Sequence, residues 1–176
     1  AIEIHPGTPN VYFQINNKKG DHGSVDDIFD KATYVAQVDG RSSRQPHLPI
    51  EPDVGFAYYD EDGKLMIHSK SIGLHLHLYM IAPGLGVEPE NIALVQNNAG
   101  GTFGYKFSPT MEALVGVACL ATDRPVHLRY DYQQQMAYTG KRSPFFVNMR
   151  FAADKSGKLQ AMETDWSVDH GPYSEF

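Results

Sequence analysis

Two stretches of the chain each predict a β-hairpin, and they constrain the fold more than any other feature. In "VGFAYYDEDGKLMIHSK", two strand-like runs flank the turn Asp60-Glu61-Asp62-Gly63. The stretch "FFVNMRFAADKSGKLQAMETDWSVDHG" repeats this pattern around Asp154-Lys155-Ser156-Gly157. Strand-like runs joined by a short polar turn with glycine are typical of antiparallel strand pairs. The chain is therefore expected to build largely antiparallel sheets.

Further strands and a few helices are predicted around the hairpins. "ATYVAQVDG", "NIALVQN" and "RPVHLRYDY" are typical of strands, whereas three prolines in "RQPHLPIEPD" exclude a central strand or a helix. "GLHLHLYMIAPGLGV" favours a helix that ends before Pro83-Gly84. A buried helix is expected up to Ala121, with Ser108 as its N-cap and Pro109 at its first helical position. Mixed, largely antiparallel sheets with hairpins and a few buried helices define an α+β fold.

The chain divides by composition into two segments. Residues 1–31 are rich in Pro, Gly, Asn and Asp and are interpreted as a linker or loop-rich entry segment, with one short strand around Val11–Ile15. Residues 32–176 carry the regular patterns and are expected to form the folded domain. Within them, "YDYQQQMAYTGKRSP" is interpreted as a solvated loop.

Charge, hydropathy and cysteine count exclude several functions. A net charge of −6 with no basic stripe argues against a nucleic-acid partner. No apolar run approaches the roughly 20 residues that span a bilayer, so no membrane role is expected. A single cysteine, Cys119, excludes an intrachain disulfide and a four-cysteine metal site, and it is expected to be a small buried hydrophobe. Neither end resembles a natural terminus, and both are interpreted as cut.

The stretch "NNAGGTFGYKFSPTMEA" is the strongest candidate for a ligand site. Gly100, Gly101 and Gly104 lie between a predicted strand and a predicted helix, where free backbone N–H groups collect and bind anions. The spacing fits neither a P-loop nor a Rossmann fingerprint. Two interpretations remain open. The segment is either a ligand cradle, with Phe103 as a wall and the Gly104 N–H presented, or a tight turn between strand and helix.

Two other polar groups are weaker candidates. His75 and His77 are two residues apart, which points them to different sides of a helix, so a metal site is disfavoured and partly buried polar positions are expected. Gln45, His47 and Glu51 lie in the proline-rich segment. They are interpreted as a structural corner that bonds the backbone, in preference to an acid–base pair.

Several separated motifs, in order, resemble one family. "RQPHLPIEPD", "IHSKSIGLHLHLYMIAPGLG", "GGTFGYKFSPTMEA" and the segment from "RPVHLRYDY" to the C-terminus resemble the molybdenum hydroxylases of the xanthine oxidase family, and most closely the aldehyde oxidoreductases of sulfate-reducing bacteria. The resemblance implies that residues 32–176 are a partial molybdopterin-binding domain. It implies that molybdopterin cytosine dinucleotide with molybdenum is bound at Gly101, Thr102, Phe103 and Gly104.

The resemblance also implies an activity and its limits in this chain. Family members of this kind oxidise aldehydes to carboxylic acids with oxygen from water, and pass electrons through two [2Fe–2S] clusters that would lie outside this chain. Phe107 and Phe176 would line the substrate funnel, Phe107 standing where purine enzymes carry an acid. No catalytic residue and no direct metal ligand are assigned here, because the family's catalytic glutamate lies in a downstream segment.

The resemblance further implies partners and a compartment. A flavodoxin or ferredoxin is expected as electron acceptor, a homodimer as the assembly, and the cytoplasm as the location, with the periplasm left open. The alternatives are a molybdenum hydroxylase of the xanthine, nicotinate or carbon monoxide type, and a non-catalytic nucleotide- or phosphate-binding module.

Overall fold

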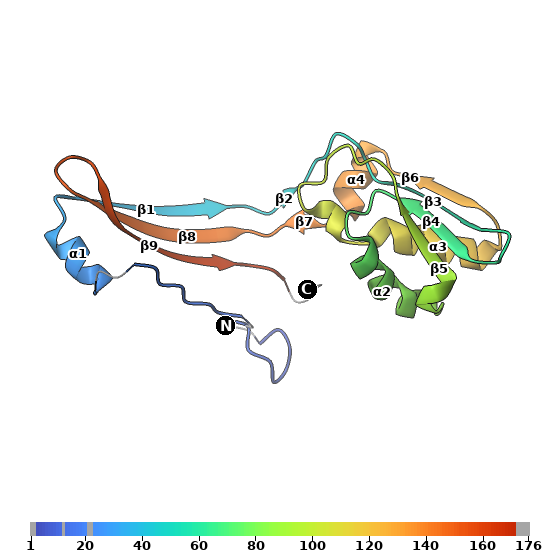
Figure 1. The fold of residues 1–176 in the computed structure, drawn as a ribbon, viewed down its shortest axis with the longest axis horizontal. Helices are drawn as coiled ribbons and strands as arrows, with labels where there is room; N and C mark the ends of the chain where they lie inside the picture. The colour runs from blue at the N-terminus through green and yellow to red at the C-terminus, as the bar shows by residue number, and fades with distance from the viewer. Residues whose placement is uncertain (1–2, 12, 21–22, 172–176) are drawn as a thin grey trace. The chain divides into compact units, whose positions relative to one another are not determined.

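The chain folds into two compact units. The computed structural model describes residues 3–11, 13–20 and 23–171. Unit 1 comprises Ala1–Arg44 and Ser143–Phe176, and unit 2 comprises Gln45–Arg142 (Figure 1). Helices alternate with strands that pair mostly antiparallel, which confirms the α+β class.

Unit 2 contains a four-stranded sheet in the order β5-β4-β3-β6. Its strands are β3 (Val54–Tyr59), β4 (Leu65–Ser69), β5 (Ile92–Gln96) and β6 (Val126–Arg129). The β3–β4 hairpin is confirmed, and its turn is closed by Asp60, whose side chain accepts the backbone N–H of Lys64 at 2.8 Å. β5 pairs parallel with β4, unlike the other strands of the sheet, because a helix crosses between them.

Two helices, α2 (Leu74–Leu85) and α3 (Thr110–Thr122), pack against this sheet (Figure 1). The core between them includes Ala57, Ile67, Val115 and Cys119, each fully buried. Glycine allows the close approach of these layers, since a Cβ on Gly55 would lie 2.7 Å from Met111 Cγ. Cys119 is therefore the small buried hydrophobe that its apolar surroundings predict.

Both predicted helices have different boundaries in the structure. α2 does not end before Pro83 but includes it and ends at Leu85, where Gly86 adopts a left-handed conformation and caps the helix. A proline in the last turn gives up a single backbone hydrogen bond, which the helix tolerates at its end. Ser108 is not the N-cap of α3; Pro109 takes that position. Two short 3₁₀ helices, η1 (Pro89–Asn91) and η2 (Tyr105–Phe107), were also not predicted.

The segment interpreted as a solvated loop forms a helix, α4 (Tyr132–Tyr138). Its start is fixed by a capping box, in which Asp131 accepts the Gln134 N–H at 2.8 Å and Gln134 accepts the Asp131 N–H at 3.0 Å. At the boundaries of unit 2, β2 (Gln45–Pro46) pairs antiparallel with β7 (Lys141–Arg142). β2 is a two-residue strand of a two-stranded sheet, a position that proline tolerates.

Unit 1 contains a three-stranded antiparallel sheet in the order β1-β8-β9. β1 (Tyr34–Ser42) was predicted, and β8 (Phe145–Ala153) with β9 (Leu159–Val168) confirms the second hairpin. A helix that was not predicted, α1 (Val25–Lys31), buries Phe29 under the guanidinium of Arg150, 4.2 Å from the ring centroid. The strand expected around Val11–Ile15 is wrong for its described residues, 11 and 13–15, which belong to no strand.

Candidate functional site

The glycine loop, residues 100–104, leads from the β5 segment to η2 and has an unusual backbone. Gly101, Phe103 and Gly104 have φ values of 99°, 52° and 95°. A positive φ suits glycine, but it strains a residue with a side chain, and such strain is concentrated at functional sites. Thr102 turns the loop back on itself, because its Oγ1 accepts the Gly104 N–H at 3.3 Å and its carbonyl accepts the Tyr105 N–H at 3.0 Å.

A second segment, the proline loop of residues 47–51, lies against the glycine loop. Glu51 and Gly100 bond to each other in both directions: the Gly100 N–H donates to Glu51 Oε2 at 2.7 Å, and the Glu51 N–H donates to the Gly100 carbonyl at 3.4 Å. A Cβ on Gly100 would lie 2.7 Å from Glu51 Cβ. Gly100 is therefore required by close packing, whereas Gly101 and Gly104 are required by their positive φ.

Glu51 also forms ion pairs with two lysines. Its carboxylate lies 2.8 Å from the Nζ atom of Lys106 and 3.1 Å from that of Lys70. Burial opposes the charged form, but the hydrogen bonds from Lys106, the Gly100 N–H and Lys70 dominate and lower the pKa of Glu51 to about 2. Lys106 is almost fully buried and needs this counter-charge. Glu51 is thus a corner that bonds the backbone, as one of the two sequence interpretations predicts.

A buried polar group beneath the loop was missed from the sequence. Asp53 Oδ2 accepts the Tyr105 hydroxyl at 2.5 Å, and the Asp53 N–H donates to Gln135 Oε1 at 2.8 Å. Burial raises the pKa of the Asp53 carboxyl, which the Tyr105 hydroxyl partly opposes. The only sequence signal was an aspartate directly after Pro52 and before a strand, which is also common in ordinary turns. These contacts fix the end of the glycine loop to the sheet.

His47 and Arg142 border the open side of the glycine loop. Apart from atoms of the two adjoining residues, the one described heavy atom within 4 Å of a Cβ on Gly104 would be His47 Nε2, at 3.9 Å. Arg142 Nη2 donates to the Phe103 carbonyl at 3.0 Å. Burial lowers the pKa of His47, the Gly140 carbonyl opposes this, and the charges of Arg142 and Lys141 add to the lowering. These effects together favour the neutral form of the imidazole.

The structure brings together most of the residues predicted to form the site. Gly101, Thr102, Phe103 and Gly104 form one continuous loop, and Phe107 follows in η2. Phe103 is 59% exposed and Phe107 is 44% exposed, so both rings are available to a ligand in this chain. Phe176 lies outside the described residues.

The two histidines of α2 have different environments. His77 is fully buried; Nδ1 lies 2.5 Å from Ser71 Oγ, and Nε2 bonds the Phe107 carbonyl. His75 is exposed. The expectation of two partly buried positions is therefore wrong for both, because the turn of α2 points one inward and one outward. Within the described ranges, no group of three or more His, Cys, Asp or Glu side chains could hold a metal ion.

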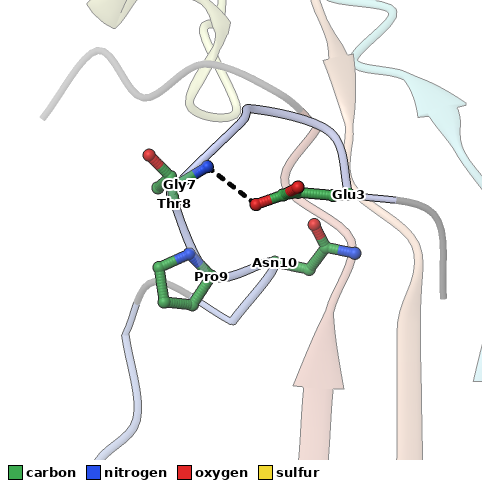
Figure 2. A pocket seen from close by; sticks show the side chains of 5 residues that line it. All are labelled: Glu3, Gly7, Thr8, Pro9 and Asn10. Atoms are coloured by element: carbon green, nitrogen blue, oxygen red, sulfur yellow. Dashed lines mark hydrogen bonds between the residues drawn. The ribbon is translucent and has the colours of Figure 1, made fainter.

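A hollow in unit 1 has little chemistry to offer. It is lined by Glu3, Gly7, Thr8, Pro9 and Asn10 (Figure 2). Its polar groups bond to their own loop, since Glu3 accepts the Gly7 N–H at 2.7 Å and Asn10 accepts the Ile4 N–H at 3.1 Å.

No helix in the described part of the chain is long and apolar enough to cross a membrane.

Comparison with known proteins identifies the class. Residues 4–176 match the molybdopterin cofactor-binding domain, and the chain belongs to this family. Over its whole length it is 66% identical to the aldehyde oxidoreductase of Megalodesulfovibrio gigas. A solved structure of the aldehyde oxidoreductase from Desulfovibrio gigas covers the whole chain with a TM-score of 0.84 at 67% identity. The chain spans only 19% of the length of each of these two proteins.

A more distant relative shows how broad the family is. The nicotinate dehydrogenase large molybdopterin subunit of Eubacterium barkeri is 26% identical over 89% of this chain, which spans 37% of that protein. The chain is therefore far more similar in sequence to the aldehyde oxidoreductase, at 66% identity, than to the nicotinate dehydrogenase subunit, at 26%.

Proposed function

We propose that this chain supplies part of the cofactor-binding region of a molybdenum-dependent aldehyde oxidoreductase. The support is the 66% identity to such an enzyme over the entire chain, including the glycine loop and the proline loop. The proposed cofactor is molybdopterin cytosine dinucleotide with molybdenum. The residues proposed to bind it are Gly101, Thr102, Phe103 and Gly104.

Within the structure, one observation supports the position of the cofactor site: the exposed, side-chain-free face of Gly104. The residue has a φ of 95°, and a Cβ there would meet only His47 Nε2, at 3.9 Å, among the described residues. The neighbouring Phe103 presents an exposed ring beside it. The Gly104 N–H is bonded within the loop to Thr102 Oγ1, so what the loop offers is a surface without a side chain, flanked by an aromatic ring. Such a surface fits a large group that approaches the main chain closely.

The loop's own contacts explain how it would hold such a group. Hydrogen bonds between the loop and both Glu51 and Arg142, and between Asp53 and Tyr105 at its end, set its shape before a ligand arrives, so less ordering entropy is lost on binding. The bound molybdenum cofactor would supply the oxidation of an aldehyde to a carboxylic acid, with oxygen from water. Phe107 would present an apolar surface to the substrate, as would Phe176.

The remaining parts of the proposal concern the complete enzyme. Electrons would leave through two [2Fe–2S] clusters outside this chain, to a flavodoxin or ferredoxin. The enzyme would be a homodimer in the cytoplasm. The catalytic base would also lie outside this chain.

The test uses the full-length protein that contains this chain. The purified protein should contain about one molybdenum per protomer, release a cytosine nucleotide on acid hydrolysis, and reduce a dye when benzaldehyde is added. Molybdenum with activity on xanthine or nicotinate but not on aldehydes would assign it to another branch of the family. A protein that binds nucleotides but neither molybdenum nor pterin would contradict the proposal and favour a non-catalytic module.

A further inference from the structure

The side chain of His47 in unit 2 contains a buried polar atom whose hydrogen-bonding capacity the fold does not satisfy. Its Nδ1 atom is buried and makes no hydrogen bond of normal geometry with a described residue, although the Gly140 carbonyl lies near enough to act as an acceptor for the ring and raise its pKa. Its Nε2 atom faces the open side of Gly104. Buried polar atoms in proteins are normally hydrogen-bonded, so an exception requires a reason.

The backbone on both sides of this position is strained. Leu48, the next residue, has a φ of 46°, and Phe103 on the facing loop has a φ of 52°. These two and Asp123, the C-cap of α3, are the non-glycine residues of the described chain with positive φ. Two of the three strained residues, Leu48 and Phe103, are therefore chain neighbours of His47 and Gly104. Strain that persists in one place points to a function there.

The proline loop holds His47 firmly in place. Tyr132 donates its hydroxyl to the Pro49 carbonyl at 2.8 Å, and Glu51 is bonded to the glycine loop at the other end of the segment. The ring of Tyr105 lies 5.9 Å from the imidazole, centroid to centroid. An imidazole held this way is placed to present Nε2 to a ligand without reorganisation.

We propose that His47 is a cofactor-binding residue whose Nε2 atom would form a hydrogen bond with the molybdopterin group bound at the glycine loop. This inference rests on the proposed function and adds a residue to it. The pterin and its substituents carry both donors and acceptors, and a neutral imidazole can serve either with Nε2. Burial, which lowers the pKa of His47, favours the neutral ring.

Three variants of the full-length protein distinguish a binding role from a structural one. His47→Leu removes both nitrogens. His47→Gln can place an amide near the position of Nε2, whereas His75→Gln changes an exposed histidine on α2 and is the control. If His47 serves the ligand, losing its unpartnered buried nitrogen should not weaken the protein without cofactor.

The measurements are molybdenum content per protomer and the Tm of the cofactor-free and cofactor-loaded forms. His47→Leu should retain about tenfold less molybdenum after dialysis, with the Tm of the cofactor-free form equal to or above that of the wild type. His47→Gln should retain more molybdenum than His47→Leu, and His75→Gln should match the wild type.

Two results would overturn the inference alone. One is equal molybdenum retention by the wild type and His47→Leu. The other is a fall in the Tm of cofactor-free His47→Leu that accounts for its lost molybdenum, which would make His47 a structural residue. A wild-type protein that contains no molybdenum would overturn the proposed function first, and this inference with it.

Discussion

Gly104 combines a left-handed backbone with an open face, and its replacement tests both. We expect Gly104→Val in the full-length protein to lose most of its molybdenum, because the branched side chain would enter the space beside His47 and strain a φ of 95°. The backbone cost, about 1–2 kcal/mol, should leave the protein folded. Elemental analysis and circular dichroism would measure the two effects.

Gly40→Val is the matched control, since Gly40 lies in β1 with an ordinary φ and open space around it. It should keep the wild-type molybdenum content. Full molybdenum content and an unchanged kcat in Gly104→Val would show that the glycine loop is only a turn.

Glu51 is predicted to stabilise the protein in a pH-dependent way. Its pKa is about 2 in the folded protein, against an ordinary value of 4.5, so its contribution is fully present above pH 4.5 and is lost as the pH falls through 2. Allowing for its partial exposure to solvent, Glu51→Gln should lower the free energy of unfolding at pH 7 by about 2 kcal/mol.

Urea unfolding of the full-length protein at pH 7 and pH 3 would measure this difference. The difference in unfolding free energy between the wild type and Glu51→Gln should be smaller at pH 3 than at pH 7. A difference in unfolding free energy of the same size at both pH values would mean that the loss does not depend on the charge of Glu51, and no difference at either pH would mean that the amide replaces the carboxylate fully.

Phe107 is predicted to select apolar substrates. If Phe107 lines the substrate funnel of the proposed enzyme, Phe107→Glu would place a carboxylate without a partner against the substrate. In the full-length enzyme we expect kcat/KM for aldehydes to fall by one to three orders of magnitude, about 1.4–4 kcal/mol of transition-state binding. Steady-state kinetics with benzaldehyde, acetaldehyde and xanthine at equal molybdenum content would measure it. Unchanged aldehyde kinetics would place Phe107 away from the substrate path.

At the scale of the elements, helix α4 is linked to the segment beneath the glycine loop by the buried side-chain amide of Gln135. Gln135 accepts the backbone N–H of Asp53, and Gln135→Leu would leave that buried donor without its partner. We expect the free energy of unfolding to fall by about 1–3 kcal/mol. Gln133→Leu, an exposed change on the same helix, should alter it by less than about 0.5 kcal/mol. Urea unfolding would compare the two, and equal effects would exclude a special role for Gln135.

The elements that the sequence predicts best are those whose ends carry distinctive residues. Both hairpins have a polar turn with glycine, and both are correct. α4 was missed because its residues are polar and its capping box, Asp131 with Gln134, was not recognised as a helix start. The end of α2 was misplaced because tertiary packing lets a helix continue through a proline near its end.

Of the candidate site, only the glycine loop could be predicted from the sequence. The glycine loop stood out because missing side chains are visible in a sequence. Its partners were not, because Glu51 lies 49 positions from Gly100 and Asp53 lies 52 positions from Tyr105. Nothing local in the sequence marks such pairs. His47 was noted as a candidate, but its position beside Gly104 required the structure.

For the whole molecule, we predict that this chain expressed alone binds no molybdenum cofactor and oxidises no aldehyde. Related proteins are several times longer, and one loop provides only part of the contacts that a large cofactor needs. The sheet of unit 1 exposes large apolar side chains, including Trp166 at 60% and Tyr34 at 61%, which favours self-association. Elemental analysis, an aldehyde assay and light scattering would test this, and stoichiometric molybdenum with turnover would contradict it.

The short pairing of β2 with β7 has an evolutionary consequence. Gln45 and Arg142 are cross-strand partners, so unit 2 begins and ends at one place, and in unit 1 Ser42 and Phe145 are likewise partners. In the sequence, unit 2 is inserted between β1 and β8, two strands that pair antiparallel as the strands of a hairpin do. Insertion of a module there, or its exchange by recombination, would leave the register of β1 and β8 unchanged. The junction is thus a point at which descendants of one ancestral gene could diversify their ligand site while inheriting the same sheet.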